Sequence, residues 1–463
     1  MLLRRVLLPT ALIGSAMVWA CSSCSGPMPS AAFDAGADVH KSKDGGFDAG
    51  PLDASEQPDV DVDAGFNPFI GNWAPIPGAP AFCKTRYTQS PDKDISEWQF
   101  KTCVSNRPGC QRFVQDWSTF GREVMTFPVY EPVMLANGKA MIAYQREWSN
   151  QLGSFAEMSI VQELGGKATL AVGNGSLQDP KSDCSARVFV GVAGPVTLDY
   201  VTVNASTSAY FALASWGSPS IQLQAEIPPA AFGGEVFPAM ARGTATDVFT
   251  MNQAGGGAVP VWHGATNTIS LAAQINSEAP RAVGGMAVVK YFDPPYGLRL
   301  VKPDATWVQI QTPQAMRITN EFAVDRANGD QLVWVESEFG NPYKNSVLWT
   351  SPFATSAVAL QPRAVAAVSD AIGYGATEMV ANVGVALYRV SDTTARVVRL
   401  SDGWGWDFTV EAGDAFMRPL WVDDNEIWVA IADASKPYDK RDMFGVLRLS
   451  RTLAGPATVP PGL

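Results

Sequence analysis

Short apolar stretches rich in Val, Trp, Tyr and Phe alternate with turns of Gly, Asn, Asp and Pro along residues 66–463. The turns return about every eight to twelve residues, and hardly any stretch has the 3.6-residue period of an amphipathic helix. Short strands at this spacing are typical of all-β sandwiches, barrels and propellers. The pattern therefore predicts an all-β body, and an internal sequence period would favour a propeller.

Three hairpin signatures indicate such a period. Residues 131–144, 322–334 and 418–429 each contain an apolar stretch, a short turn and a second apolar stretch. The first two have Asn-Gly in the turn, which is the strongest short-range hairpin signal, and the third has Asp-Asn. Weaker turn candidates lie between them, so that the chain divides into seven units with turns at Gly138, Gly194, Gly243, Gly285, Gly329, Gly384 and Asn425.

A third strand follows the hairpin in the clearer units, at residues 346–350, 395–400 and 445–449. Three to four strands in about 40 to 50 residues is typical of a propeller blade. We therefore expect a β-propeller of about seven four-stranded blades. Tandem β-sandwich domains are the alternative.

Two of the hairpins carry a motif that resembles a known family. Pro419-Leu420-Trp421 is followed by an Asp-rich turn and Ile427, and Pro132 is followed by Asn137-Gly138. These segments resemble the Pro-x-Trp-Ser-Pro-Asp-Gly-x-x-Ile blade motif of TolB-like (WD40-like) propellers. The resemblance implies a propeller fold and partnership with proteins of the cell envelope.

The first 20 residues differ in composition from the body. Arg4 and Arg5 precede an apolar run over residues 6–19, and the small residue Ala20 follows it. This order is typical of a secretory signal peptide. The run is shorter than the roughly 20 apolar residues of a spanning helix, so residues 1–20 are predicted to be a cleaved leader.

The end of the leader, Val18-Trp19-Ala20-Cys21, resembles the lipobox of bacterial lipoproteins. The resemblance implies that Cys21 is lipidated and becomes the new N-terminus. Ser22 stands where an aspartate would retain such a protein in the inner membrane, so the resemblance implies anchoring in the outer membrane. An ordinary secretory signal, giving a secreted or periplasmic soluble protein, is the alternative.

Residues 21–65 are rich in Asp, Ala and Gly. Residues 34–63 hold nine acidic side chains against Lys41 and Lys43. Low hydrophobicity with charge of one sign predicts a disordered, self-repelling tether. The sequence therefore predicts a signal peptide at 1–20, a lipidation site and tether at 21–65, and a propeller domain at 66–463.

Four cysteines lie in the N-terminal part of this domain, at Cys83, Cys103, Cys110 and Cys184. An even set in an exported domain predicts two disulfides, for which three connectivities exist. The turn-forming loop between Cys103 and Cys110 favours a bond across it, which leaves Cys83 for Cys184. Zinc is the less favoured alternative, because the spacings do not give two short Cys-x-x-Cys pairs.

Few residues suggest catalysis. The only histidines are His40 and His263, so a Ser-His-Asp triad could use only His263, which we expect to end a strand. Gly165-Gly166-Lys167 lacks the Ser or Thr of a phosphate loop. Glycosidases need two carboxylates about 5 to 10 Å apart, and the available ones lie in predicted turns or edges: Glu336, Glu338, Asp407, Asp423, Asp424 and Glu426. No catalytic residue, metal site or cofactor is therefore predicted, and the existence of an enzymatic activity is left open.

Aromatic side chains in predicted loops are the stronger signal. Trp404 and Trp406 follow a Ser-Asp-Gly turn, and Tyr296 lies in a Pro-rich turn at residues 293–297. Exposed rings stack on sugars or anchor protein partners, although rings in a propeller also pack between blades. The three residues are therefore candidate ligand-binding positions.

The net charge of -11 lies mostly in the tether, so the body offers no basic stripe for nucleic acid. Together these features predict a lipid-anchored envelope protein that acts as a non-catalytic binding or scaffold module for a protein or a cell-wall glycan. A carbohydrate-active hydrolase with carboxylates on the propeller face is the alternative. The sequence gives no prediction of the oligomeric state.

Overall fold

Antiparallel sheets follow one another along the chain, each built mainly from strands that are neighbours in sequence. In the part that the computed structural model describes, 31 strands form seven sheets. That part comprises residues 72–80, 83, 85–91, 99–107, 109–114, 123–135, 137–149, 155–174, 184–191, 193–203, 206–217, 221–227, 238–242, 247–252, 259–272, 280–291, 297–310, 317–338, 344–368, 379–436 and 445–451. It belongs to the unit Ser55–Leu463, and the predictions for the leader, Cys21 and the tether fall outside the described residues.

Five of the sheets have four strands in chain order. Blade 2 contains β9 (Ser185–Gly191), β10 (Gly194–Val203), β11 (Ser206–Leu213) and β12 (Gln222–Ile227). Blade 3 contains β13 (Pro238–Arg242), β14 (Asp247–Asn252), β15 (Val259–His263) and β16 (Thr268–Ala272). Blade 4 contains β17 (Arg281–Val283), β18 (Met286–Tyr291), β19 (Gly297–Val301) and β20 (Trp307–Ile310).

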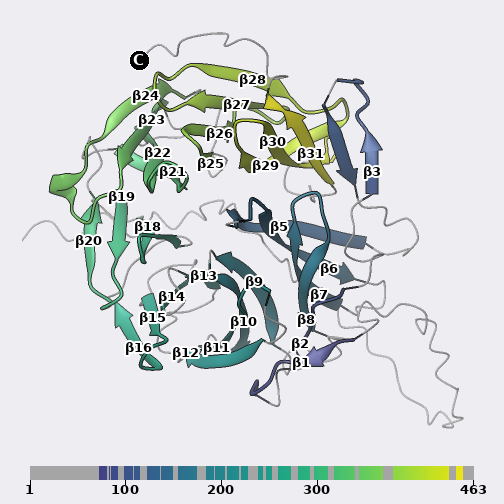
Figure 1. Ribbon diagram of the computed structural model, residues 1–463, viewed down its shortest axis with the longest axis vertical. Helices are drawn as coiled ribbons and strands as arrows, with labels where there is room; N and C mark the ends of the chain where they lie inside the picture. Colours follow the sequence, from purple (N-terminus) through teal and green to yellow (C-terminus); the bar gives the residue numbers. More distant parts are fainter. Residues whose placement is uncertain are drawn as a thin grey trace, which may run out of the picture. The chain divides into compact units, whose positions relative to one another are not determined.

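Blades 5 and 6 continue the same order. Blade 5 contains β21 (Arg317–Asp325), β22 (Gln331–Glu338), β23 (Lys344–Pro352) and β24 (Arg363–Ala367). Blade 6 contains β25 (Met379–Asn382), β26 (Val385–Arg389), β27 (Thr394–Arg399) and β28 (Gly405–Thr409). Figure 1 shows the sheets succeeding one another in a ring. The predicted seven-bladed, all-β propeller is therefore confirmed, in place of tandem sandwiches.

The first and last sheets are larger than the four strands predicted. Blade 1 contains β5 (Glu123–Met134), β6 (Ala140–Ser149), β7 (Phe155–Glu163) and β8 (Ala168–Asn174), and β2 (Thr85–Thr88) and β1 (Ala74–Pro75) extend it beyond β8. Blade 7 contains β29 (Asp414–Val422), β30 (Glu426–Asp433) and β31 (Gly445–Ser450), followed by β4 (Gln111–Val114) and β3 (Gln99–Thr102). The fourth strand of the last blade thus comes from the N-terminal side of the first blade, which closes the ring.

Six of the seven turn positions that define the sequence repeat lie at equivalent places in their blades. In the described part of the chain, Gly138, Gly194, Gly285, Gly329, Gly384 and Asn425 each separate the first strand of a blade from its second. Gly243 falls outside the described residues, in the stretch between β13 and β14. Gly329 and Gly384 have φ of 75° and 77°, a backbone conformation that side chains other than glycine rarely adopt.

Large aromatic residues on the second strands fill the spaces between blades. Tyr144, Trp334, Tyr388 and Trp428 occupy the second strands of blades 1, 5, 6 and 7, and each is at most 3% exposed. Trp334 lies in a core shared by blades 4 and 5, and Tyr388 in a core shared by blades 5 and 6. Burial of such a side chain contributes roughly 1.5 to 3 kcal/mol. Trp334 and Tyr388 therefore hold neighbouring blades together, as does Trp428, whose cluster includes Ala140 and Leu164 of blade 1, whereas Tyr144 packs within blade 1.

Helix is nearly absent from the described residues, where the short 3-10 helix η2 (Ala357–Ala359) is recorded. A search of the same residues found no helix with the length and hydropathy needed to cross a membrane.

Candidate functional site

A disulfide fixes the segment that follows β3, residues 103–112, which includes the start of β4 and which we call the closing hairpin. Cys103 and Cys110 are bonded across it, and Cys83 is bonded to Cys184, as the sequence predicts. The two disulfides indicate an oxidising, extracytoplasmic location.

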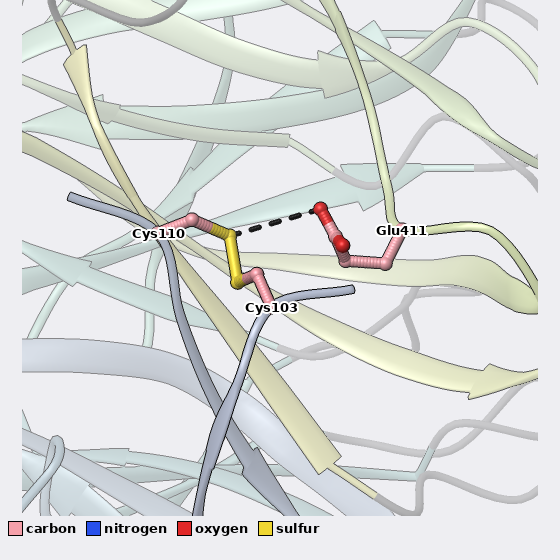
Figure 2. Close-up of side chains that lie close together, drawn as sticks. All are labelled: Cys103, Cys110 and Glu411. Atoms are coloured by element: carbon pink, nitrogen blue, oxygen red, sulfur yellow. Dashed lines mark hydrogen bonds between the residues drawn. A yellow bond between two sulfur atoms is a disulfide. The ribbon is translucent and has the colours of Figure 1, made fainter. Parts of the chain in front are cut away.

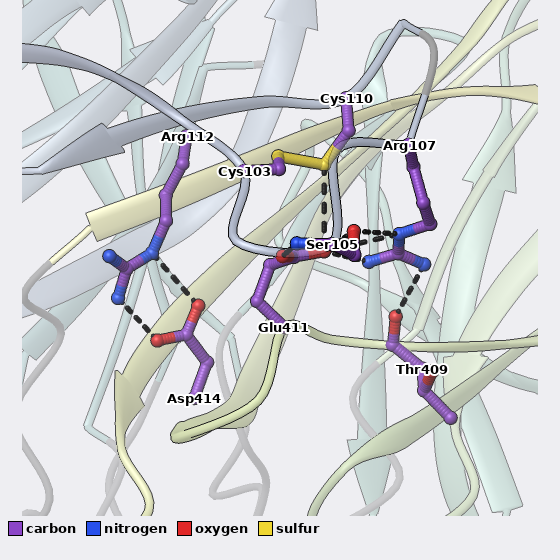
Figure 3. Close-up of a disulfide and its surroundings, with 8 residues drawn as sticks. All are labelled: Cys103, Ser105, Arg107, Cys110, Arg112, Thr409, Glu411 and Asp414. Atoms are coloured by element: carbon purple, nitrogen blue, oxygen red, sulfur yellow. Dashed lines mark hydrogen bonds and ion pairs between the residues drawn. A yellow bond between two sulfur atoms is a disulfide. The ribbon is translucent and has the colours of Figure 1, made fainter.

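Glu411 anchors the closing hairpin to the segment between blades 6 and 7. Its carboxylate accepts hydrogen bonds from the backbone N–H and the hydroxyl of Ser105, both at 2.7 Å, and it pairs with the Arg107 guanidinium. Arg107 also donates to the Thr409 carbonyl at 3.0 Å. Figure 3 shows these groups converging below the disulfide. The Glu411 side chain is fully buried, so its charge depends on these partners.

The pKa values of two carboxyls in this region shift in opposite directions. Burial opposes ionisation of Glu411, but the hydrogen bonds from Ser105 and the charge of Arg107 outweigh it and hold the pKa of Glu411 below its ordinary value. Asp414 forms a two-bond ion pair with Arg112. Burial dominates there and raises the pKa of Asp414 despite the pair.

Cys103, Cys110 and Glu411 also bring three metal-ligating atoms within 4.8 Å of one another. Figure 2 shows the Glu411 carboxylate directed at the sulfur of Cys110, at 3.8 Å. Both sulfur atoms belong to the disulfide, so they are not thiolates that could bind a metal. The cluster is a structural junction, and its bonded sulfurs do not support the zinc alternative.

Two of the three predicted aromatic positions lie at the last hairpin of blade 6. Trp404 lies in the turn between β27 and β28 and is 36% exposed, whereas Trp406 is half-buried within β28. Trp406 was expected in a loop, but it lies within a regular strand, between buried Gly405 and exposed Asp407. Strand β28 is the edge of the sheet opposite β25, and Figure 1 shows it on the perimeter of the ring. Tyr296 lies outside the described residues.

Two arginines lie near the Trp406 ring, and Asp402 accepts a hydrogen bond from the backbone N–H of Trp404. The guanidinium groups of Arg399 and Arg451 lie 5.8 and 5.9 Å from the centre of the Trp406 ring. Arg399 donates to both carboxylate oxygens of Asp402, and its hydrogen bonds lower the pKa of Asp402. We call the group Arg399, Asp402, Trp404, Trp406 and Arg451 the aromatic rim.

The aromatic rim therefore presents an exposed ring beside fixed charges of both signs. Tryptophan gives a ligand a large flat contact, and neighbouring charged groups supply directional hydrogen bonds. The two arginines could not be selected from the sequence, because an isolated arginine at the end of β27 and another directly after β31 belong to no motif.

Each of the six carboxylates considered for glycosidase chemistry has a partner within the fold. Asp423 accepts from the Trp421 indole, Asp424 pairs with Arg451, Glu426 with Arg448, Asp407 with Arg396, Glu336 accepts from the Trp334 indole, and Glu338 from the Asn345 amide. These contacts fix turns and neighbouring strands. The six groups come from blades 5, 6 and 7, and this geometry supports a structural role for them.

A small cleft lies where blade 7 meets blade 1, lined among others by Phe113, Gln162, Gly165 and Trp428. The cleft has room for about one water molecule. A Cβ atom on Gly165 would lie 2.6 Å from the Trp428 ring, so glycine is required there. The cleft is too small to hold a sugar unit.

No protein-family model matches the chain, and no curated protein matches it. Among solved structures, oligogalacturonate lyase from Vibrio parahaemolyticus is similar with a TM-score of 0.50 and 8% identity, over 78% of this chain and 98% of that chain. Sqt1 from Saccharomyces cerevisiae has a TM-score of 0.40 and 5% identity, over 82% of this chain and 94% of that chain. Prolyl oligopeptidase B from Galerina marginata has a TM-score of 0.40 and 9% identity, over 76% of this chain and 56% of that chain. The first of these likenesses shows the propeller fold alone.

Proposed function

We propose that the protein is a lipid-anchored envelope protein whose propeller binds a cell-wall glycan or an envelope protein through the aromatic rim. The observation that carries the binding role is the exposure of Trp404 beside Trp406, whose ring lies near two arginines. Exposed tryptophan and arginine are the residues that most often dominate binding energy. The rim lies on a disulfide-containing domain, which agrees with action outside the cytoplasm.

A hydrolase remains the less supported function. Asp402 of the rim and the neighbouring Asp407 are held by two-bond pairs with Arg399 and Arg396. The hydrogen bonds from Arg399 lower the pKa of Asp402, which makes this carboxylate a poor proton donor. Binding without glycan cleavage at the rim therefore fits these contacts better.

Replacing Trp404 with alanine tests the binding surface. We expect an affinity loss of about 30-fold, equivalent to about 2 kcal/mol, because a central aromatic contact is removed from a partner. Co-sedimentation with purified peptidoglycan and titration with fractionated envelope proteins measure the affinity. Phe100→Ala is the matched control, since Phe100 is 57% exposed on β3 and lies outside the aromatic rim. Equal binding by the wild type and Trp404→Ala would contradict the proposed surface.

Replacing Cys21 with serine tests the anchor. The full-length precursor is expressed in a bacterium, and we expect the variant to lose incorporation of labelled fatty acid and to leave the membrane fraction. Acyl chains contribute about 0.8 kcal/mol for each buried methylene, so their loss removes the attachment. Cys24→Ser is the control, because it keeps Cys21 and removes a nearby cysteine. Unchanged membrane retention of Cys21→Ser would remove the anchor from the proposal.

A further inference from the structure

A serine, a histidine and an aspartate meet on one face of blade 3. The hydroxyl of Ser270 lies 3.1 Å from Nε2 of His263, and Nδ1 of His263 lies 3.4 Å from Oδ1 of Asp247. The three residues come from three adjacent strands, β16, β15 and β14. One ring nitrogen therefore faces the hydroxyl and the other faces the carboxylate.

Strand register places the three side chains together. Asp247 is directly opposite His263, so both side chains point to the same face of the sheet. Ser270 is opposite Val261, which is two residues before His263 and shares its face. Strand β15, which carries His263, is hydrogen-bonded to β14 on one side and to β16 on the other, so the backbone fixes the relative positions of the three residues.

The order of contacts is the one that activates a serine nucleophile. In a Ser-His-Asp triad, the histidine takes the hydroxyl proton through Nε2, while the carboxylate orients the ring through Nδ1. The His263 and Asp247 side chains are 20% and 18% exposed, and Ser270 is half-buried. A substrate can therefore reach the hydroxyl, while the carboxylate is partly shielded from water.

The surroundings of Ser270 suit an uncharged acyl group. Val261, on the face of Ser270, belongs to a cluster against which Trp307 of blade 4 packs. Strand β16 is also the edge of its sheet, and edge strands direct backbone N–H groups outward, which is the kind of donor that stabilises an oxyanion.

We propose that Ser270, His263 and Asp247 form an acyl-transfer site that hydrolyses carboxylic esters with a small apolar acyl group. The Ser270 oxygen forms a bond to the ester carbonyl carbon, and His263 Nε2 takes its proton. The carbon–oxygen bond to the alcohol then breaks, and His263 returns the proton to the departing alcohol. Water hydrolyses the acyl-serine by the same steps, releasing the acid and restoring Ser270.

This activity is independent of the binding role at blade 6, so the two can be tested separately. The full-length mature protein is incubated with a fluorophosphonate probe and with p-nitrophenyl acetate and butyrate. We expect covalent labelling at Ser270, located by peptide mass mapping, and ester hydrolysis above the rate in buffer. Ser270→Ala should abolish the labelling and lower kcat/KM at least 100-fold, the scale at which general-base catalysis acts.

Further variants separate a catalytic role from a structural one. Asp247→Asn should lower kcat while leaving KM unchanged, because Asp247 positions the ring and does not contact the ester. Thr266→Ala, which removes an exposed hydroxyl from the neighbouring turn, should keep both labelling and hydrolysis. Absence of probe at Ser270 in the wild type, or hydrolysis that persists in Ser270→Ala, would overturn the proposal.

Discussion

Replacing both Cys83 and Cys184 with alanine should lower the free energy of unfolding by about 4 to 5 kcal/mol. The disulfide joins residues 101 positions apart, and a cross-link over a loop of about 100 residues restricts the unfolded chain by about 4.7 kcal/mol. Both cysteines are buried beside Tyr210, so alanine also loses packing. Denaturant unfolding of the mature domain, followed by tryptophan fluorescence, measures the change.

The second disulfide is the internal control for this prediction. Cys103 and Cys110 are only seven positions apart, and the same relation gives about 2.5 kcal/mol for their replacement by alanine. The long-range bond should therefore contribute more. A larger loss from the Cys103/Cys110 double variant would show that attachment of the closing hairpin, and not restriction of the unfolded chain, dominates the stability.

Replacing Glu411 with alanine is expected to cost about 3 kcal/mol. The substitution removes the one carboxylate that accepts from both Ser105 and Arg107, and it leaves their donors directed at an apolar gap. Thermal unfolding of the wild type and the variant measures the loss. Glu411→Gln is the matched control, because it keeps the shape and one acceptor oxygen, and it should lose less than the alanine variant. Equal stability of all three proteins would contradict the role of Glu411.

The stability difference between the wild type and Glu411→Gln should also depend on pH, in a direction that can be measured. Because the pKa of Glu411 is lowered on folding, its stabilisation is present above the ordinary glutamate pKa of about 4.3 and is lost as the pH falls through the folded value. The difference in Tm between wild type and Glu411→Gln should therefore shrink in acid.

Asp414 should behave oppositely, because burial raises its pKa and protonation favours the folded state. As the pH falls, the Tm of the wild type should therefore rise relative to the Tm of Asp414→Asn.

The blades were predictable because their signals are local. An Asn-Gly pair between two apolar stretches specifies a hairpin within about ten residues, and glycine is required where φ is positive, as at Gly329. The spacing of such turns then gives the repeat without knowledge of any long-range contact. The third strands at 346–350 and 445–449 follow from the same alternation.

Contacts between distant segments could not be predicted in this way. The sequence of residues 111–114 is that of an ordinary short strand, and nothing in these four residues specifies β31 as the strand with which they pair. Arg107 and Glu411 are 304 positions apart, and neither belongs to a motif. His263 was correctly expected to end a strand, but its neighbours Asp247 and Ser270 depend on strand register, which the apolar pattern leaves undetermined.

The origin of β4 has a consequence for biosynthesis. Its residues are synthesised well before their partners on β31, since Gln111 and Arg448, which bond to each other, are 337 positions apart. Contacts of such separation form slowly, because the intervening chain must first be ordered. The hairpin of β3 and β4 can form alone at an early stage, since its own pairing is local. The ring can therefore be completed only after β31 has been synthesised, when a preformed hairpin docks on blade 7.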